Sequence, residues 1–239
     1  MQRYFAIDMI DDKLVLKDED KFHLFNVLRL KKGEIFQVVY NGFLYECTVE
    51  NPKLGDFQYK ISRKLVDNQY IFSIILGVSK NSKIETVLQK CTEIGINHFY
   101  IYESKRSVAK MDKKVFESKR SRFEKTIIEA AQQSKQDFIP AIEFIEDINK
   151  FDFSNYENKF VAYENELTDS ITKFDKIKNS KSFIFSVGPE GGFSEEEISE
   201  YLSIGFEKIS LGNSILRCET APIYIASVVS FIKNGASND

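Results

Sequence analysis

Two glycine-containing segments in the last quarter of the chain give the clearest indication of chemistry. The first spans 187–193 and reads Val-Gly-Pro-Glu-Gly-Gly-Phe; the second spans 211–222 and reads Leu-Gly-Asn-Ser-Ile-Leu-Arg-Cys-Glu-Thr-Ala-Pro. Each follows a short apolar run and precedes a predicted helix start. Glycine at such points lets the backbone adopt a positive φ or approach a ligand closely. Two turns of this kind side by side would form a pocket lined by backbone.

The strands predicted before the two segments, and the motifs that the sequence lacks, restrict the class of ligand that such a pocket could bind. Ligands of open α/β sheets bind beyond the carboxyl ends of the strands, and strands are predicted before both segments, over 182–187 and 206–211. Free backbone N–H groups and helix N-termini there suit an anionic or polar ligand. The sequence contains neither G-x-G-x-x-G nor G-x-x-x-x-G-K-S/T, which disfavours a standard Rossmann or P-loop function.

Side chains that act as nucleophiles or metal ligands are sparse in this sequence. It has no G-x-S-x-G or H-E-x-x-H motif. Cys47, Cys91 and Cys218 are far apart and form no C-x-x-C pair, which argues against a disulfide framework or a zinc site. His23 and His98 are isolated, so no metal site of His and Cys ligands is expected and no metal residue is assigned, while a site of carboxylates stays open. An enzyme built on this sequence is therefore expected to bind and orient a reactive cofactor.

Composition and charge place further bounds on the function. The 239 residues are 43% hydrophobic and 29% charged, enough for one large domain or two smaller ones. No apolar run approaches the ~20 residues that span a bilayer, and no signal peptide is evident, so we expect a cytoplasmic protein. The net charge is -3, yet residues 103–125 hold nine Lys or Arg against four acids. A charge run alone is most typical of a solvated helix face.

Residues 1–69 are predicted to form a small β-rich domain. Strands over 36–40 and 43–49 flank Asn41-Gly42, a strong signal for a two-residue hairpin turn. A third strand is predicted over 57–61 and a helical turn over 23–30. Short strands with one short helix favour a compact barrel.

Residues 70–239 alternate between strands and helices, which predicts an α/β domain with a mostly parallel sheet. The apolar run 71–78 is typical of a strand buried on both faces. A capping box of Ser82 and Glu85 predicts the next helix, with Gly95 as its C-cap. Further strands are predicted over 98–102, 141–145, 159–163, 182–187 and 206–211. One further helix is predicted over 112–134, and another begins at a capping box of Ser194 and Glu197. A third is predicted over 221–233. Because this last helix is almost wholly apolar, it should be buried or lie in an interface.

Taken together, the two glycine segments resemble those of the RsmE-type 16S ribosomal RNA uridine N3-methyltransferases of the SPOUT superfamily. The resemblance rests on Gly188-Pro189-Glu190-Gly191-Gly192-Phe193 and on Ser210-Leu211-Gly212 followed by Ile215-Leu216-Arg217-Cys218-Glu219-Thr220-Ala221. It extends, in the family's order, to residues 3–5, 23–30, 89–95, 105–108 and 129–134. One departure is Gln136, where the family usually has Arg.

The resemblance implies a fold, a cofactor and a substrate. It implies a PUA-like RNA-binding β-barrel over 1–69 and a SPOUT methyltransferase domain with a trefoil knot over 70–239. It further implies S-adenosylmethionine as the cofactor, S-adenosylhomocysteine as the product, and a homodimer. The expected partner is the 16S rRNA of the small ribosomal subunit, and the expected reaction is methylation of uracil N3.

The resemblance also assigns roles to individual residues. Cofactor binding is expected of Gly188, Pro189, Glu190, Gly191, Gly192, Leu211, Gly212, Asn213, Ile215, Leu216 and Arg217. RNA binding is expected of Arg3, His23, Arg29, Lys31, Lys32, Lys105, Arg106, Gln132 and Gln133. Since a cation stabilises a developing uracil anion, Arg217 is the first candidate for catalysis. Glu219, Glu93 and Glu190 are the candidates for a general base.

Two other functions remain open on the sequence. A SPOUT 2′-O-ribose methyltransferase would share the cofactor pocket but methylate a sugar hydroxyl. A non-catalytic RNA-binding or ribosome-assembly protein would retain the fold with a vestigial pocket.

Overall fold

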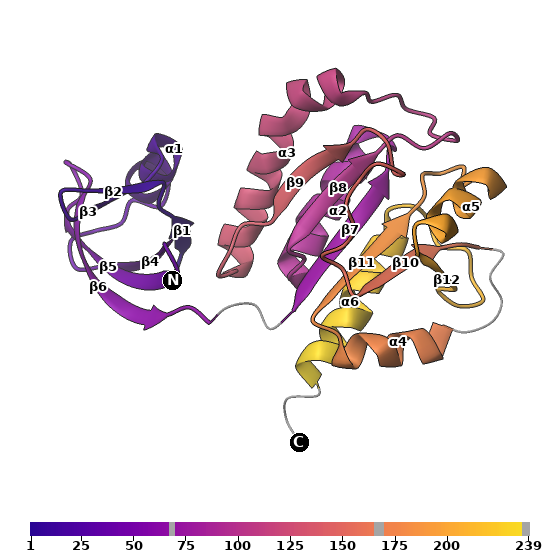
Figure 1. The fold of residues 1–239 in the computed structure, drawn as a ribbon. Coiled ribbons are helices and arrows are strands. Elements are labelled where there is room, and N and C mark those ends of the chain that lie inside the picture. Colours follow the sequence, from indigo (N-terminus) through magenta and orange to yellow (C-terminus); the bar gives the residue numbers. More distant parts are fainter. Residues whose placement is uncertain (67–69, 165–169, 236–239) are drawn as a thin grey trace. The chain divides into compact units, whose positions relative to one another are not determined.

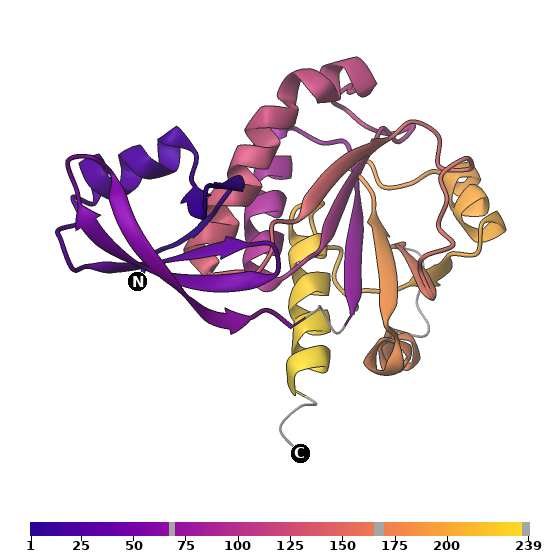
Figure 2. The same cartoon turned by 60° about the vertical axis from the view of Figure 1, so that its left-hand side comes forward.

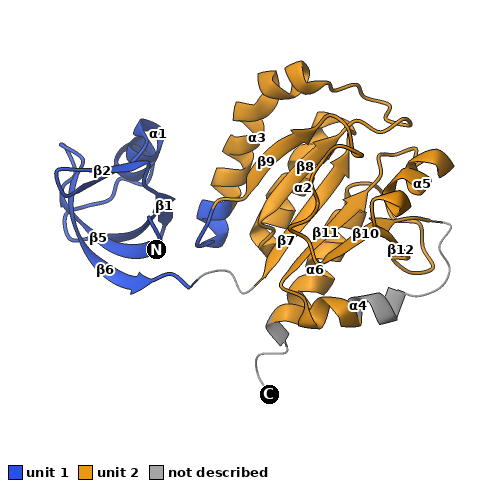
Figure 3. Cartoon of the chain, in the orientation of Figure 1, with its two compact units in different colours: residues 1–67, 131–138 blue, residues 68–130, 139–239 orange. Residues whose placement is uncertain are grey.

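The computed structural model describes residues 1–66, 70–164 and 170–235, and the chain divides into two compact units (Figure 1). Unit 1 comprises residues 1–67 and 131–138, and unit 2 comprises residues 68–130 and 139–239 (Figure 3). The placement of 131–138 in unit 1 differs from the sequence expectation. Its physical reason is that Ala131 packs in one apolar cluster with Phe5 and Leu44, while Asp137 pairs with Arg3.

Unit 1 is built on a four-stranded sheet with the order β1-β4-β5-β6 and a separate hairpin of β2 and β3. Its elements are β1 (Arg3–Phe5), β2 (Asp8–Ile10), β3 (Lys13–Val15), α1 (Asp18–Phe22), the π-helical turn η1 (His23–Val27), β4 (Ile35–Tyr40), β5 (Phe43–Asn51) and β6 (Asp56–Lys64). The predicted turn between β4 and β5 is confirmed, because Asn41 and Gly42 both have positive φ, 44° and 76°. Tyr4, Leu16 and Leu24 pack in its core against β4 and β5.

Unit 2 contains a six-stranded sheet in the order β12-β10-β11-β7-β8-β9, and every neighbouring pair is parallel. Its elements are β7 (Ile71–Gly77), α2 (Asn81–Ile94), β8 (His98–Tyr102), α3 (Lys113–Ser134, ending in unit 1), β9 (Ala141–Ile145), β10 (Asn158–Ala162), α4 (Ser170–Asn179), β11 (Ser182–Val187), α5 (Glu195–Ser203), β12 (Glu207–Ile209) and α6 (Thr220–Gly235). The predicted α/β class and parallel sheet are confirmed.

Both faces of the unit 2 sheet are covered, which explains the continuous apolar runs of its strands. Helices α2, α3, α4 and α6 cover one face, and α5 with the segment around 148–156 covers the other (Figure 2). Successive residues of β7 alternate between the two cores: Ile74 packs on the α2 side and Ile75 on the α5 side. A strand buried on both faces has no solvent-facing side at which polar residues would alternate with apolar ones.

The two predicted capping boxes have different outcomes. At α5, the Ser194 hydroxyl accepts from the Glu197 N–H at 3.2 Å and the Glu197 carboxylate accepts from the Ser194 N–H at 2.9 Å. This box is confirmed. The box of Ser82 and Glu85 is wrong, because α2 begins earlier, with Lys80 at the N-cap and no side-chain cap. Glu85 forms an ion pair with an arginine of α3 instead.

Several element bounds also differ from the predictions. The helical segment predicted over 23–30 begins at Asp18 and ends at Val27. The strand predicted over 206–211 is shorter, Glu207–Ile209, which leaves the following residues free to line a cavity. The short strands β2 and β3 and helix α4 were not predicted.

Candidate functional site

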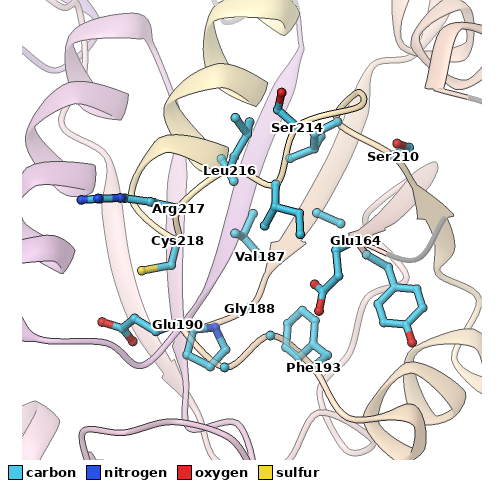
Figure 4. Close-up of a pocket in the computed structure, with 18 of the residues that line it drawn as sticks. Glu164, Val187, Gly188, Glu190, Phe193, Ser210, Ser214, Leu216, Arg217 and Cys218 are labelled. Carbon is cyan, nitrogen blue, oxygen red and sulfur yellow. The ribbon is translucent and has the colours of Figure 1, made fainter. Parts of the chain in front are cut away.

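A cavity of about 480 Å³ lies in unit 2 beyond the carboxyl ends of β10, β11 and β12 (Figure 4). Its wall consists of residues 162–164, 187–193 and 210–218 together with Lys83 and Ala221. The two glycine segments thus lie side by side, as the sequence predicted. The position agrees with the rule that ligands of parallel sheets bind where the strands end.

The first glycine segment is packed so closely that side chains are excluded. A Cβ on Gly192 would lie 2.9 Å from the Glu164 carboxylate, and the φ of Gly192 is 65°. A Cβ on Gly188 would lie 3.1 Å from the carbonyl carbon of Gly192. A Cβ on Gly77, at the end of β7, would lie only 2.6 Å from the nitrogen of Pro189. Gly77 and Gly188 are required by the close approach of backbone to backbone, and Gly192 by its positive φ.

The second glycine segment leads into α6 through a hydrogen-bonded turn. The N–H groups of Thr220 and Ala221 donate to the carbonyl of Arg217 at 2.8 and 2.9 Å. Gly212 has a φ of 112° with open space around it, so its requirement is conformational. Ile215, expected to cover a face of the ligand, is 84% exposed and leaves an apolar side chain at the cavity wall.

Every residue predicted to bind a cofactor contributes to this one cavity: Gly188, Pro189, Glu190, Gly191, Gly192, Leu211, Gly212, Asn213, Ile215, Leu216 and Arg217. The structure therefore brings the whole predicted set together. Their role in binding stays a prediction.

Four wall residues escaped the sequence analysis: Lys83, Ala162, Tyr163 and Glu164. The Glu164 carboxylate points into the cavity (Figure 4) and has no hydrogen bond or ion pair with other described residues. A signal for two of them existed, because Tyr163 and Glu164 follow β10 and the carboxyl-end rule applies to that strand as well. Lys83 lies in the first turn of α2, and nothing local marks it.

Lys83 connects the two glycine segments through ion pairs. Its Nζ lies 3.1 Å from Glu190 Oε1 and 3.3 Å from Glu219 Oε2. The hydrogen bond to Glu190 is the main cause of the raised pKa of Lys83. Burial acts to raise the pKa of each carboxyl, but backbone hydrogen bonds and Lys83 outweigh it and lower the pKa of both Glu190 and Glu219. A carboxylate with a lowered pKa is a poor proton acceptor, which disfavours Glu219 as the general base.

Cys218 lies beside these charges and behaves as a neutral thiol. Burial and the hydrogen bond that its thiol donates to Glu219 at 3.2 Å raise the pKa of Cys218 to about 11. A thiol that stays neutral is typical of a packing residue. Glu93, the third candidate base, pairs with Lys90 at 3.0 Å on α2 and is not part of the cavity wall.

Arg217 lies at the edge of the cavity rather than in its interior. Its side chain is exposed, and Figure 4 shows the guanidinium directed away from the cavity. Among the described residues it has no side-chain hydrogen bond or ion pair. Arg217 is therefore a cation available to a ligand that approaches from solvent.

In unit 1, Arg3 does not fit its predicted contact with RNA. Its side chain is 8% exposed and its Nη1 lies 2.6 Å from the Asp137 carboxylate. The guanidinium also donates to Gln37 and to the carbonyls of Lys135 and Gln136. With its donors engaged and its side chain buried, Arg3 stabilises unit 1, and we assign it a structural role.

The other predicted RNA contacts of unit 1 are more accessible. Arg29, Lys31 and Lys32 are exposed. His23 is exposed, with its Nδ1 2.7 Å from the Tyr4 hydroxyl.

The two glutamines near the end of α3 differ from each other. The Gln132 amide donates to Asp20 at 2.9 Å, whereas Gln133 is exposed. Asp20 has a pKa raised by burial, which this hydrogen bond partly offsets. Gln132 is therefore committed to a protein partner, and Gln133 presents its amide to solvent.

In unit 2, Lys105 and Arg106 follow β8 next to the first glycine segment. The Lys105 N–H donates to Glu197 at 2.8 Å and its ammonium lies 3.3 Å from Glu200. Arg106 is exposed and donates to the Gly191 carbonyl at 3.4 Å. Arg106 is thus a predicted RNA contact that lies against the cavity wall.

Among the described residues, no group of three or more His, Cys, Asp or Glu side chains is arranged to hold a metal ion. No helix in the same ranges has both the length and the apolar character to cross a membrane.

Structures of known proteins share this fold. A protein of Legionella pneumophila, solved in complex with bound SAM, superimposes with a TM-score of 0.82 at 25% identity over 95% of this chain and 96% of that chain. A ribosomal RNA small subunit methyltransferase E from Neisseria gonorrhoeae has a TM-score of 0.79 at 24% identity, with 98% of each chain covered.

Sequence comparisons identify the family. Residues 67–230 match the RNA methyltransferase domain, and residues 16–61 match the RNA methyltransferase PUA domain. The chain is 30% identical to ribosomal RNA small subunit methyltransferase E of Bacillus subtilis, over 97% of this chain and 96% of the relative. It is 31% identical to ribosomal RNA small subunit methyltransferase E 2 of Borreliella burgdorferi, over 88% of each. The chain therefore belongs to the ribosomal RNA small subunit methyltransferase E family.

Proposed function

We propose that this protein methylates N3 of a uracil in the 16S rRNA of the small ribosomal subunit, with S-adenosylmethionine as the methyl donor. The observation that carries the proposal is a single cavity walled by both glycine segments, in a chain of this methyltransferase family. When bound, S-adenosylmethionine supplies the electrophilic methyl group and leaves as S-adenosylhomocysteine.

The cavity fits an adenosine-containing cofactor. Its volume of about 480 Å³ lies within the range of small-molecule sites, roughly 300–1,000 Å³. The backbone of 188–192 and 211–213 offers N–H and C=O groups to the adenine edge, and Leu216 offers an apolar contact. We assign Glu164 to the ribose, because a carboxylate accepts hydrogen bonds from hydroxyl groups and this one has no partner among the described residues.

The methylated atom makes two demands on the protein. Uracil N3 lies on the Watson–Crick edge, so the target base must be unpaired or flipped out. The N3 proton must also leave, and negative charge then develops on the ring. Arg217, an exposed cation at the cavity edge, is the residue that we propose stabilises this charge.

Phosphate contacts would position the RNA. In unit 1 this role falls to the exposed Arg29, Lys31 and Lys32, and in unit 2 to Lys105 and Arg106. Arg106 has the added property of lying against Gly191 in the cavity wall.

We further propose that the protein is a cytoplasmic homodimer whose domain over 70–239 contains a trefoil knot. The resemblance to the family implies the dimer and the knot. In support of a dimer, α6 carries exposed aromatic side chains, Tyr224 at 42% and Phe231 at 77%, which a second copy would cover.

The test is to incubate the protein with methyl-labelled S-adenosylmethionine and unmodified small-subunit particles, then to digest the RNA and identify the labelled nucleoside by mass spectrometry. Label in 3-methyluridine is expected. Label in a 2′-O-methylated nucleoside would instead identify a ribose methyltransferase. Absence of S-adenosylmethionine binding in calorimetry would favour a non-catalytic RNA-binding protein.

A further inference from the structure

We propose that Lys83 is a positioning residue that ties the two glycine segments of the cavity together, so that cofactor affinity depends on its ammonium group. The inference rests on the proposed function. The tie consists of Lys83, Glu190 in the first segment and Glu219 at the end of the second. Lys83 Nζ is 3.1 Å from Glu190 and 3.3 Å from Glu219.

The tie matters because it is a polar link between two segments that otherwise share the apolar packing of Val187, Leu211 and Leu216 in one core cluster. In the ranges that the structure describes, no hydrogen bond directly joins residues 187–193 to residues 210–219. Each segment is closed on itself, the first by the Gly192 N–H donating to Pro189 and the second by turn bonds to the Arg217 carbonyl. Lys83, held on the rigid α2, is the group through which one segment is bonded to the other.

Charge makes the lysine necessary to this arrangement. The side chains of Glu190 and Glu219 are 26% and 22% exposed, so water screens them only in part. Both have lowered pKa values, against the effect of burial, and are ionised at neutral pH. Without Lys83, two negatively charged carboxylates would lie near each other with no cation between them. Their repulsion would move apart the segments that carry them.

The geometry favours a tie over direct contact between Lys83 and the ligand. A lysine ammonium has three donors. Within hydrogen-bonding reach of Nζ are Glu190, Glu219 and the sulfur of Cys218 at 3.6 Å. Three acceptors for three donors leave none for the carboxylate of the methionine moiety of the cofactor.

Calorimetry with two ligands tests the tie. S-adenosylhomocysteine carries the amino-acid carboxylate, and 5′-methylthioadenosine lacks it. For Lys83→Met we expect both ligands to bind about tenfold more weakly, because a partly buried charged network is lost. Lys83→Arg should recover most of the affinity. Lys80→Met is the matched control, since Lys80 is an exposed lysine just before α2 with no side-chain partner among the described residues; it should bind as the wild type does.

The outcomes separate the inference from the proposed function. Wild-type affinity of Lys83→Met for both ligands would overturn the tie and leave the proposed function intact. A loss confined to S-adenosylhomocysteine would also overturn it, because that pattern indicates direct contact with the carboxylate. A wild-type protein that binds neither ligand would refute the proposed cofactor itself.

A second variant covers the case in which Lys83→Met is poorly folded. Glu219→Gln removes one arm of the tie without leaving an unpaired carboxylate there. In the same calorimetry we expect it to weaken the binding of both ligands several-fold, because one of the two ion pairs of Lys83 is lost. Wild-type affinity of Glu219→Gln for both ligands would contradict a positioning role.

Discussion

Gly77→Ala is the substitution for which the structure gives the sharpest expectation. The new Cβ would lie 2.6 Å from both the nitrogen and Cδ of Pro189 and 2.9 Å from the carbonyl carbon of Gly188. Ordinary contacts between such atoms are about 3.5–4.0 Å, so the overlap is about 1 Å. Two of the three neighbours are backbone atoms and the third belongs to a rigid ring, so the loop must move as a whole.

The cost of this overlap can be bounded. Overpacking of a well-packed site costs about 1–3 kcal/mol. For a chain of this size each kcal/mol lowers Tm by about 2–4 °C, so a fall of about 2–12 °C is expected. Because the displaced residues, Gly188 and Pro189, form the cavity wall, S-adenosylmethionine should also bind at least about tenfold more weakly.

Gly95→Ala is the matched control for this prediction. Gly95 is the C-cap of α2, has a φ of 105° and has open space where a Cβ would lie. Alanine there costs about 1–2 kcal/mol of backbone strain and lowers Tm comparably. It is not part of the cavity wall, so the Kd of S-adenosylmethionine should not change. Thermal melting and calorimetry on both variants decide the matter, and a Gly77→Ala protein with wild-type Kd and Tm would refute the packing argument.

Three further predictions address other parts of the chain. Arg3→Met should lower the free energy of unfolding of unit 1 by about 2–3 kcal/mol in urea titrations, since it strips a buried partner from Asp137, which is itself 35% exposed; a change under about 0.5 kcal/mol would argue against a structural role. Burial lowers the pKa of His98, although Glu143 acts to raise it. The stability gained by burying the neutral imidazole is therefore complete above the unfolded pKa of about 6.5, and it is lost as pH falls toward the lower pKa of the folded state. Unfolding titrations of His98→Gln should lack that loss, and an unchanged pH profile would contradict it. Arg29→Ala should weaken RNA binding and reduce the slope of log affinity against log salt by about one, whereas an unchanged slope would remove Arg29 from the phosphate contacts.

The features that were predictable from sequence are those with local signals. The strand–turn–helix pattern around 187–193 and 211–222 needs only neighbouring residues to be recognised, and the carboxyl-end rule then places both turns at one edge of the sheet. The Asn41-Gly42 turn and the box of Ser194 and Glu197 are likewise local, and both are confirmed. Even a local motif can be wrong when the helix can begin at a neighbouring residue. The box of Ser82 and Glu85 does not form because α2 begins with Lys80 at the N-cap.

The features that escaped prediction depend on contacts between distant parts of the chain. Arg3 resembled an RNA contact because its charge was visible and its burial against Asp137 was not. The same holds for Lys83, whose partners are more than 100 positions away in the sequence. A sequence shows which side chains are charged. Whether such a side chain can contact a ligand depends on its partners in the fold, which the sequence does not show.

Backbone packing and charged side chains have different roles in the cavity. Backbone packing fixes the first glycine segment, so that substitutions such as Gly77→Ala act on the shape of the cavity. The charged side chains act on the distance between the two glycine segments. Lys83 and its two carboxylates neutralise one another in part and hold the two segments together. Arg217, which has no such partner in the described ranges, is the cation that we propose acts on the substrate. Substitution of Gly77 should therefore weaken cofactor binding at least about tenfold, loss of the tie should weaken it about tenfold, and loss of Arg217 should abolish methyl transfer.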